Sequence, residues 1–170
     1  AIAWAYCYNI DLKAIQKGIE EVKGIRGRLE VVYRNNDYKI IVDFAHTEDG
    51  LEKALTTIKP FAKGRIILVF GVYAAPKEKG RDKRRAMGKV AAKYADFAVV
   101  TSDNPKEQDP NLIIEEIVED IKEENGKYIA IIDRKEAIKY AIGISQKDDI
   151  ILIAGKGHET SQVVGKQEIP

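Results

Sequence analysis

Cysteine is almost absent from this sequence of 170 residues, in which Cys7 is the only one. A single cysteine cannot form a disulfide within the chain, and the sequence has no cysteine and histidine set with the spacing of a zinc site. Cys7 lies in an apolar segment without a nearby histidine, which favours core packing over a role as a nucleophile. The shortage of cysteine favours a reducing, cytoplasmic location.

Long hydrophobic runs and an excess of one charge are absent too. No stretch approaches the roughly 18 consecutive apolar residues of a membrane-spanning helix, so we expect no membrane insertion. Lys and Arg total 28 against 27 Asp and Glu, and the net charge of +1 gives no reason to expect a nucleic-acid partner. The N-terminus, AIAWAYCYNI, lacks methionine and the features of a signal peptide, so we expect a fragment of a longer protein.

Two common phosphate-binding motifs are missing. The sequence contains neither G-x-x-x-x-G-K-[ST] nor a G-x-G-x-x-G that opens a strand-helix unit. The chain therefore has no self-sufficient nucleotide cradle.

What the sequence does have is a regular alternation of short apolar runs and amphipathic segments, which predict strands and helices. We expect strands at 29–34, 38–43, 65–70, 97–102, 128–132 and 149–154, and helices at 1–10, 11–22, 48–60, 83–95, 110–123 and 134–145. The turn residues Asn35, Asn36 and Asp37 join the first two strands into a hairpin, and the continuous apolar strands after them are typical of a covered parallel sheet. We predict an α/β fold: a Rossmann-like three-layer sandwich, with a mostly parallel sheet and helices on both faces.

Polar clusters follow the predicted strands, at the edge where such sheets bind ligands. Asp43 and His46 follow the second strand, and this pair suits phosphate or ribose; the alternative is a helix start capped by Thr47. The loop after the third strand is rich in cations, including Lys79 and Arg81, and suits carboxylates or phosphates. The alternative is a solvated loop and first helical turn.

The segment SDNPK, residues 102–106, follows the fourth strand. Pro105 predicts an extended Asn104 displayed rigidly at the edge. Helix capping by Asp109 leaves Asp103 and Lys106 free to hold the two ends of a zwitterion.

The segment AGKGHE, residues 154–159, ends the last strand. Gly155 and Gly157 permit close approach of a ligand to the backbone. Lys156, His158 and Glu159 add a cation, a titratable ring and an anion, a combination that a purely structural turn rarely needs.

Taken in order, the segments GIRGRLEVV, VDFAHTEDGLEKAL, RRAMGKVAAKYADFAVVTSDNP, DRKEAI and ILIAGKGHET resemble the C-terminal domain of the Mur ligases. The resemblance covers nearly the whole chain. Residues 25–170 are similar to that domain, and residues 1–24 are similar to the last helices of the family's central ATPase domain. Within the family, the chain looks most like the ligases that add the third peptide residue.

The resemblance implies an ATP-dependent, amide-forming ligase of peptidoglycan synthesis. Its substrates would be UDP-N-acetylmuramoyl-L-Ala-D-Glu and a diamino acid, either meso-diaminopimelate or L-lysine. In the family, ATP phosphorylates the substrate carboxylate, and the amine of the incoming amino acid attacks the acyl phosphate. The central ATPase domain would be the partner of this domain and would supply the phosphate loop and the Mg²⁺ ligands, so we expect no metal ligands here and an inactive isolated chain.

The resemblance also implies roles for individual residues. Arg28, Asp43 and His46 would face ATP, with Asp43 and His46 acting in catalysis. The residues implied to bind the amino acid are Asp103, Asn104, Lys106, Gly155 and Glu159, with Lys79 and Arg81 as rival candidates for a further cation and His158 as a positioning residue.

Three departures from the family pattern leave the substrate open. Lys106 replaces an Arg that usually grips the distal carboxylate of diaminopimelate, which keeps the charge but loses the bidentate fork. The loop 71–88 replaces a glycine-rich loop, and Glu48 stands where proline is usual. The alternatives are a murein peptide ligase, a pseudomurein peptide ligase, a folylpolyglutamate-type synthetase, or a non-catalytic module that binds a small molecule.

Overall fold

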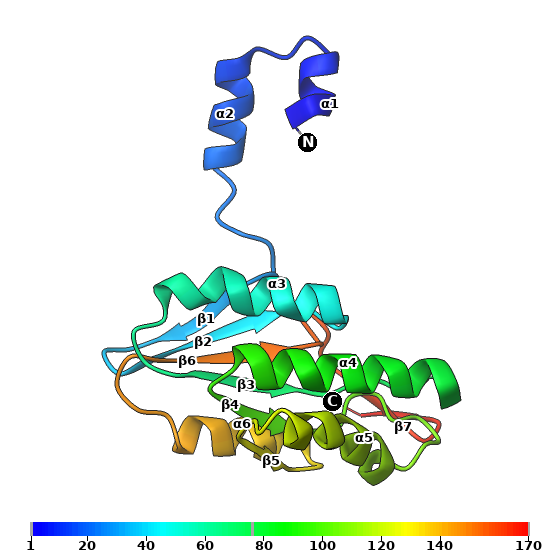
Figure 1. The fold of residues 1–170 in the computed structure, drawn as a ribbon. Coiled ribbons are helices and arrows are strands. Elements are labelled where there is room, and N and C mark those ends of the chain that lie inside the picture. The colour runs from blue at the N-terminus through cyan, green and yellow to red at the C-terminus, as the bar shows by residue number, and fades with distance from the viewer. Residues whose placement is uncertain (1, 76, 170) are drawn as a thin grey trace.

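The computed structural model describes residues 2–75 and 77–169, without the side chains of residues 77–79. The helices are α1 (Ile2–Cys7), α2 (Leu12–Glu20), α3 (Glu48–Ile58), the 3-10 helix η1 (Lys59–Phe61), α4 (Lys77–Tyr94), α5 (Pro110–Glu123) and α6 (Arg134–Gly143). The strands are β1 (Glu30–Arg34), β2 (Tyr38–Asp43), β3 (Ile66–Phe70), β4 (Phe97–Val100), β5 (Tyr128–Ala130), β6 (Asp149–Ala154), β7 (Gln162–Val164) and β8 (Gln167–Ile169). The predicted alternation of strands and helices is confirmed (Figure 1).

Six strands form one sheet in the order β1-β2-β6-β3-β4-β5. Only the β1–β2 pair is antiparallel in this sheet, and β2, β6, β3, β4 and β5 run parallel. The predicted hairpin is therefore confirmed, and its turn is held by the side chain of Asn35, which accepts the N–H groups of Asp37 and Tyr38 at 2.9 and 2.7 Å. The mostly parallel sheet is confirmed as well.

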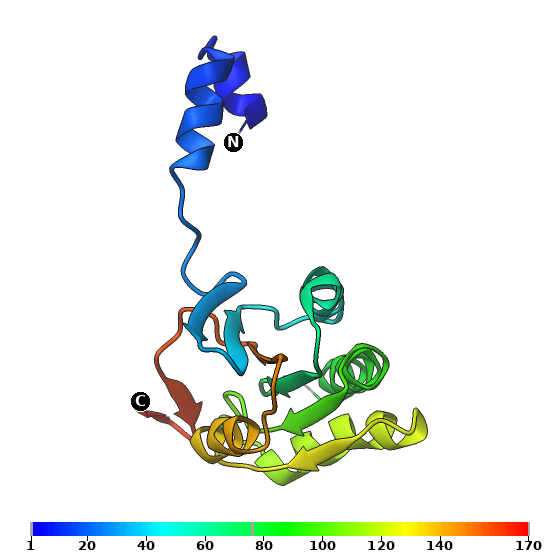
Figure 2. The ribbon, with the colours of Figure 1, turned by 90° about the vertical axis from the view of Figure 1, so that its left-hand side faces the viewer.

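Right-handed crossovers explain the unequal division of the helices between the two faces. The chain goes from β2 to β3, β4 and β5 in one direction along the sheet, so α3, α4 and α5 pack on one face. It returns from β5 to β6 in the opposite direction, which places α6 on the other face (Figure 2). Helices thus cover both faces, as a three-layer sandwich requires.

The core follows the alternation of side chains along the central strand β3. Ile66, Leu68 and Phe70 point into the cluster under α3, α4 and α5, while Ile67 and Val69 point into the cluster under α6. All five side chains are fully buried. Burial of each contributes about 1.5–3 kcal/mol, which makes β3 the anchor of the sheet whose ends carry the polar loops.

Helix α4 begins at Lys77, six residues before the predicted start at 83. Cations along this helix pair with the acidic face of α5. Arg84 donates to Glu116 at 2.6 Å, and Arg85 donates to the buried carboxylate of Asp120 at 2.7 Å. The turns before residue 83 are joined to α5 as well, because Arg81 pairs with Glu119 at 3.6 Å. Contacts with α5 thus accompany helix where the local sequence, with Gly80 and Pro76, suggested a loop.

Helices α1 and α2 lie away from the sheet in both views (Figures 1 and 2). Asp11 caps α2 by accepting the N–H of Lys13 at 3.0 Å. Neither helix has a buried residue, and Cys7 is exposed. The prediction that Cys7 packs in the core was wrong, because the apolar segment around it does not pack against the sheet. Within the described residues, no helix combines the length and the apolar character needed to span a membrane.

Candidate functional site

The carboxyl ends of the parallel strands bring the predicted polar loops to one edge of the sheet. The loops are tied to each other by backbone hydrogen bonds: Gly155 donates to the carbonyl oxygen of Asp43 at 3.1 Å, and Ser102 donates to that of Ile132 at 3.2 Å. The segments after β2, β4, β5 and β6 are therefore held together by the sheet and by one another.

The GKGHE loop after β6 makes two tight approaches. Gly157 has a φ of +54°, and a Cβ atom there would lie 2.7 Å from the Cβ of Phe44. Gly155 has a φ of +106°, and a Cβ atom there would lie 3.0 Å from Oδ2 of Asp103. A side chain at either position would be strained, so both glycines let this loop pack against the loops after β2 and β4.

The DNPK loop after β4 differs from its prediction. Asn104 has a φ of +45°, so the expected extended conformation before Pro105 was wrong. The carbonyl oxygen of the Asn104 side chain accepts hydrogen bonds from Lys156 Nζ at 2.9 Å and from the N–H of Val163 at 2.8 Å. Asparagine tolerates this left-handed conformation, and these two bonds favour it over the local preference imposed by proline.

The C-terminal hairpin β7–β8, which the sequence patterns did not predict, closes one side of this loop. The N–H of Lys106 donates to the carbonyl of Val163 at 3.1 Å, and the N–H of Gly165 donates to the carbonyl of Lys106 at 2.7 Å. The Lys106 side chain is exposed. A cavity of about 550 Å³ adjoins it, lined by Ala74, Ala75, Lys106, Glu107, Gln108, Val163, Gly165 and Lys166.

Lys156 connects the two loops. Its ammonium contacts Asn104 Oδ1 at 2.9 Å, Glu159 Oε2 at 3.1 Å, the carbonyl of Ser161 at 2.7 Å and Asp103 Oδ1 at 3.4 Å. The structure thus brings Asp103, Asn104 and Glu159 together, as predicted, but around a cation of the chain itself.

Asp103 and Arg134 form the buried floor of this cluster. Asp103 is 3% exposed, and its Oδ1 accepts no hydrogen bond from any residue that the structure describes. The guanidinium of Arg134 donates to the carbonyls of Ser102 at 3.3 Å and Ala154 at 2.7 Å, next to Asp103 and Gly155 in the chain. Burial lowers the pKa of Arg134 below its ordinary value, and the charges of Asp103 and Glu159 oppose that shift.

A second cluster surrounds Phe44, beside the first. The guanidinium of Arg28 lies 4.7 Å from the centre of the Phe44 ring, His46 meets the ring edge-on at 4.7 Å, and His158 stacks on it at 5.6 Å. His46 is also held by a 2.9 Å hydrogen bond between Nδ1 and the carbonyl of Phe44. One cation and two imidazoles thus share an aromatic centre, a combination that can stack on a base or contact phosphate.

Asp43 lies beneath this cluster. Its carboxylate accepts the N–H of Leu29 at 2.8 Å and the N–H of Ala45 at 2.7 Å, and the residue is buried. Both oxygens therefore fix the backbone that carries Arg28 and His46. The predicted role of Asp43 toward ATP and in catalysis stays a prediction.

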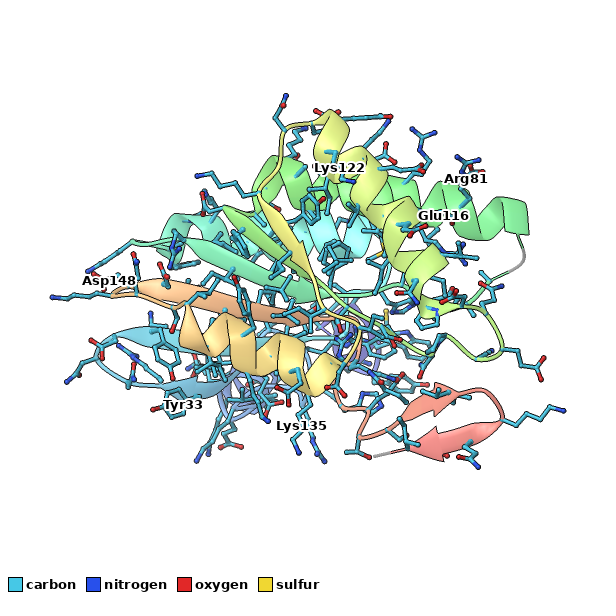
Figure 3. The ribbon with its side chains drawn as sticks, turned by 90° about the horizontal axis from the view of Figure 1, so that it is seen from below. Tyr33, Arg81, Glu116, Lys122, Lys135 and Asp148 are labelled. Atoms are coloured by element: carbon cyan, nitrogen blue, oxygen red, sulfur yellow. The ribbon has the colours of Figure 1, made fainter. Side chains whose placement is uncertain are left out.

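The two predicted cations of the loop after β3 have different outcomes. The side chain of Lys79 lies outside the described residues. Arg81 is more than half exposed and pairs with Glu119 of α5 at 3.6 Å. Figure 3 shows Arg81 on the outer side of the α4–α5 layer, away from the β7–β8 hairpin. Arg81 is therefore not placed to touch a ligand held between the GKGHE and DNPK loops in this conformation.

Sequence reasoning missed two residues of the site: it named Lys156 only as a cation of the GKGHE segment, and it gave Arg134 no role. A signal for Arg134 exists in the sequence, because it occupies the first turn of α6 directly after the N-cap Asp133. A cation is disfavoured there by the helix dipole, so its presence indicates a specific partner. For Lys156 the sequence has no such signal. The flanking glycines indicate that the backbone can be approached closely, but they do not indicate where the lysine side chain points.

The sequence of this chain is similar to that of known proteins. Residues 27–157 match the protein family described as Mur ligase, glutamate ligase domain. The chain is 46% identical over 165 residues to the UDP-N-acetylmuramoyl-L-alanyl-D-glutamate–2,6-diaminopimelate ligase of Oceanobacillus iheyensis, covering 97% of this chain and 33% of that protein. It is 44% identical over 170 residues to the ligase of the same name from Caldanaerobacter subterraneus subsp. tengcongensis, covering 100% of this chain and 34% of that protein.

Solved structures give the same assignment. A structure of a UDP-N-acetylmuramoyl-L-alanyl-D-glutamate–2,6-diaminopimelate ligase superimposes with a TM-score of 0.77 at 33% identity, covering 99% of this chain and 34% of that one. The chain thus spans about a third of the length of these relatives. The family match over most of the chain and the high identity together show that this chain belongs to the Mur ligase family, in its glutamate ligase domain.

Proposed function

We propose that this chain is the amino-acid-binding domain of an ATP-dependent ligase that works in the cytoplasm. The full-length enzyme would add a diamino acid to UDP-N-acetylmuramoyl-L-Ala-D-Glu during peptidoglycan synthesis. The observation that carries the proposal is the gathering of Asp103, Asn104, Lys156 and Glu159 at the carboxyl edge of the sheet. The names of relatives that are 44 to 46% identical support it.

The chemistry of this cluster suits a zwitterionic amino acid. Carboxylate oxygens of Asp103 and Glu159 accept hydrogen bonds from an ammonium group, and the nearby cations attract a carboxylate. Holding the amine in one orientation makes its attack on an activated carboxyl group effectively intramolecular. A closing domain also keeps water from that activated group. ATP, when bound, supplies the phosphoryl group that activates the carboxylate.

We propose 2,6-diaminopimelate over L-lysine as the incoming amino acid. Two backbone hydrogen bonds to the hairpin fix Lys106, while its side chain remains exposed beside the cavity. An ammonium at this position attracts a distal carboxylate, which diaminopimelate has and lysine lacks. A lysine offers a point charge instead of a fork, so the contact tolerates more positions of that carboxylate than an arginine would.

The Phe44 cluster fits the nucleotide that the family implies. Arg28 offers a cation, and His46 and His158 offer rings at the same surface. Among the described residues, no three His, Cys, Asp or Glu side chains gather as a metal site would require. We propose that Mg²⁺ is held by other parts of the full-length protein and that Arg28 and His46 contact ATP.

Substrate titrations of the full-length enzyme, read by calorimetry and by amide formation, test this function. We expect meso-diaminopimelate to bind and react, and Asp103→Ala to raise its KM by about 30-fold or more, because the variant leaves Lys156 and Arg134 without a buried counter-charge. The control is Glu115→Ala, which removes an exposed carboxylate on α5 and is expected to leave the kinetics unchanged. No reaction with either diamino acid, or an unchanged KM in Asp103→Ala, would refute the proposal; reaction with glutamate would favour a folylpolyglutamate-type synthetase.

We propose further that residues 1–24 belong with the preceding domain and residues 25–170 form the amino-acid-binding domain. Trp4, Tyr8 and Val22 are at least 60% exposed, which is unusual for apolar side chains and suggests a covering partner. The relatives are about three times as long as this chain, which leaves room for that partner.

The thiol of Cys7 reports on this arrangement. In the present chain Cys7 is exposed and is expected to react with a thiol reagent at the rate of a free cysteine. In the full-length protein the preceding domain would cover this thiol, and the reagent would reach it only when that contact opens. The reaction is therefore expected to be roughly tenfold slower or more. Kinetics followed by reagent absorbance, with each protein also measured in denaturant, give the comparison. Equal rates in the two folded proteins would contradict the domain boundary.

A further inference from the structure

The ammonium of Lys156 occupies the place in which an amino-acid amine was expected. The residue is 7% exposed, and its three N–H donors are matched by three oxygens: Asn104 Oδ1, Glu159 Oε2 and the carbonyl of Ser161. These acceptors come from the loop after β4, the loop after β6 and the approach to the hairpin. One buried cation therefore fixes the relative positions of three segments.

The charges around Lys156 are balanced, and three of the four are buried: Asp103, Lys156 and Arg134, while the side chain of Glu159 is 38% exposed. Asp103 and Glu159 are two anions, while Lys156 and Arg134 are two cations. Lys156 lies within 3.4 Å of both carboxylates, and Arg134 interacts electrostatically with both. An unbalanced charge would be costly to bury, so the half-exposed carboxylate of Glu159 complements a buried group of two cations and one anion.

Because the four charges cancel, the site stays neutral only when the bound end of the ligand has no net charge. An α-amino acid brings one ammonium and one carboxylate at its reacting end, so the total stays near zero. Without Lys156 the set would carry one excess negative charge. The altered site would then attract an amine that has no carboxylate more strongly than it attracts an amino acid.

We infer that Lys156 is a positioning residue that sets the amino-acid site in two ways. It holds Asn104 and Glu159 in the geometry that receives the substrate, and it cancels one carboxylate charge so that the site prefers a zwitterion over a simple amine. The inference rests on the proposed function and extends it, because it names a residue that makes the site selective for amino acids.

The test compares Lys156→Met, which keeps length without charge, with Lys156→Arg, which keeps charge, in the full-length enzyme. For each protein, inhibition constants are measured for L-lysine and for 1,5-diaminopentane, which is lysine without its carboxylate. We expect Lys156→Met to raise the KM of the incoming amino acid by about 50-fold, with the KM values of ATP and the UDP-linked dipeptide nearly unchanged. Its preference for lysine over the diamine is expected to fall by about tenfold, while Lys156→Arg keeps that preference.

An unchanged preference in Lys156→Met would overturn the inference, as would equal losses in the KM values of all three substrates, since a purely structural role predicts those results. Lys156→Gln gives the same measurement if Lys156→Met does not fold, as judged by thermal melting. Failure of the wild-type enzyme to form an amide with any amino acid would refute the proposed function instead, so the two failures are distinguishable.

Discussion

Replacing Gly27 by alanine is expected to lower the free energy of unfolding of this chain by about 2–6 kcal/mol. Gly27 has a φ of +71°, which costs other residues roughly 1–3 kcal/mol. A Cβ atom there would lie 2.3 Å from the backbone N of His158 and 2.4 Å from the carbonyl C of Gly157, so one of the two segments must move. Forcing extra atoms into such a contact costs about 1–3 kcal/mol more.

This contact matters for function because Gly27 lies at the entry of the chain into the sheet domain, while Gly157 and His158 belong to the GKGHE loop. Displacing that loop also moves Glu159, so amino-acid affinity is expected to fall together with stability. Urea unfolding measures the stability. Gly143→Ala is the control: no atom lies within 4 Å of its added Cβ, and its stability is expected to stay equal or rise slightly. Equal stability of the two variants would show that the contact is not rigid.

Replacing Asp149 by asparagine is expected to lower the free energy of unfolding by about 2–4 kcal/mol at pH 7. Asp149 is 2% exposed and accepts four close hydrogen bonds at the start of β6: from Arg65 Nη2 at 2.6 Å, Arg65 Nε at 3.1 Å, the N–H of Arg65 at 2.7 Å and the N–H of Gln146 at 2.8 Å. Asparagine has the same shape, but it lacks the charge and turns an NH₂ group toward these donors.

The effect of this substitution is expected to depend on pH. Burial raises the pKa of Asp149, but the hydrogen bonds and charge of Arg65, together with the Gln146 N–H, outweigh burial and hold the pKa below its ordinary value. A carboxyl group with a lowered native pKa stabilises the fold fully above its unfolded pKa, about 3.9, and loses this contribution as pH falls through the native pKa. The difference between wild type and Asp149→Asn should therefore be largest near neutral pH and shrink below about pH 4.

A matched exposed pair provides the control for Asp149. Asp49 pairs with Lys53 at 2.7 Å, nearly the same distance, but both side chains are more than 70% exposed. Asp49→Asn is expected to change stability by less than about 1 kcal/mol, because water screens the exposed pair. Urea unfolding between pH 3 and 7 checks both variants. A deficit in Asp149→Asn that is the same at both ends of this range would contradict the role of its charge.

The amino-acid sequence by itself determined most of the secondary structure and the edge at which the site lies. Alternating apolar runs gave the sheet and its helices, and helix starts at Asp11 and Asp109 follow from side chains that bond the next turn. These features depend on residues within a few positions of each other. The resemblance to the Mur ligases also depended on local strings, and comparison with known proteins confirmed it.

Tertiary structure alone decided the conformation of Asn104, the length of α4 and the exposure of Cys7. Asn104 takes a left-handed conformation because Lys156 and Val163, more than fifty positions away, bond its side chain. Helix α4 begins six residues earlier than predicted, and the added turns carry Arg81, which pairs with Glu119 of α5. The sequence named Asp103 and Glu159 as site residues, but only the parallel arrangement of β4 and β6 on either side of β3 places Lys156 between them. Local propensities extend over a few residues, whereas the balance of buried charge depends on which loops the sheet makes neighbours.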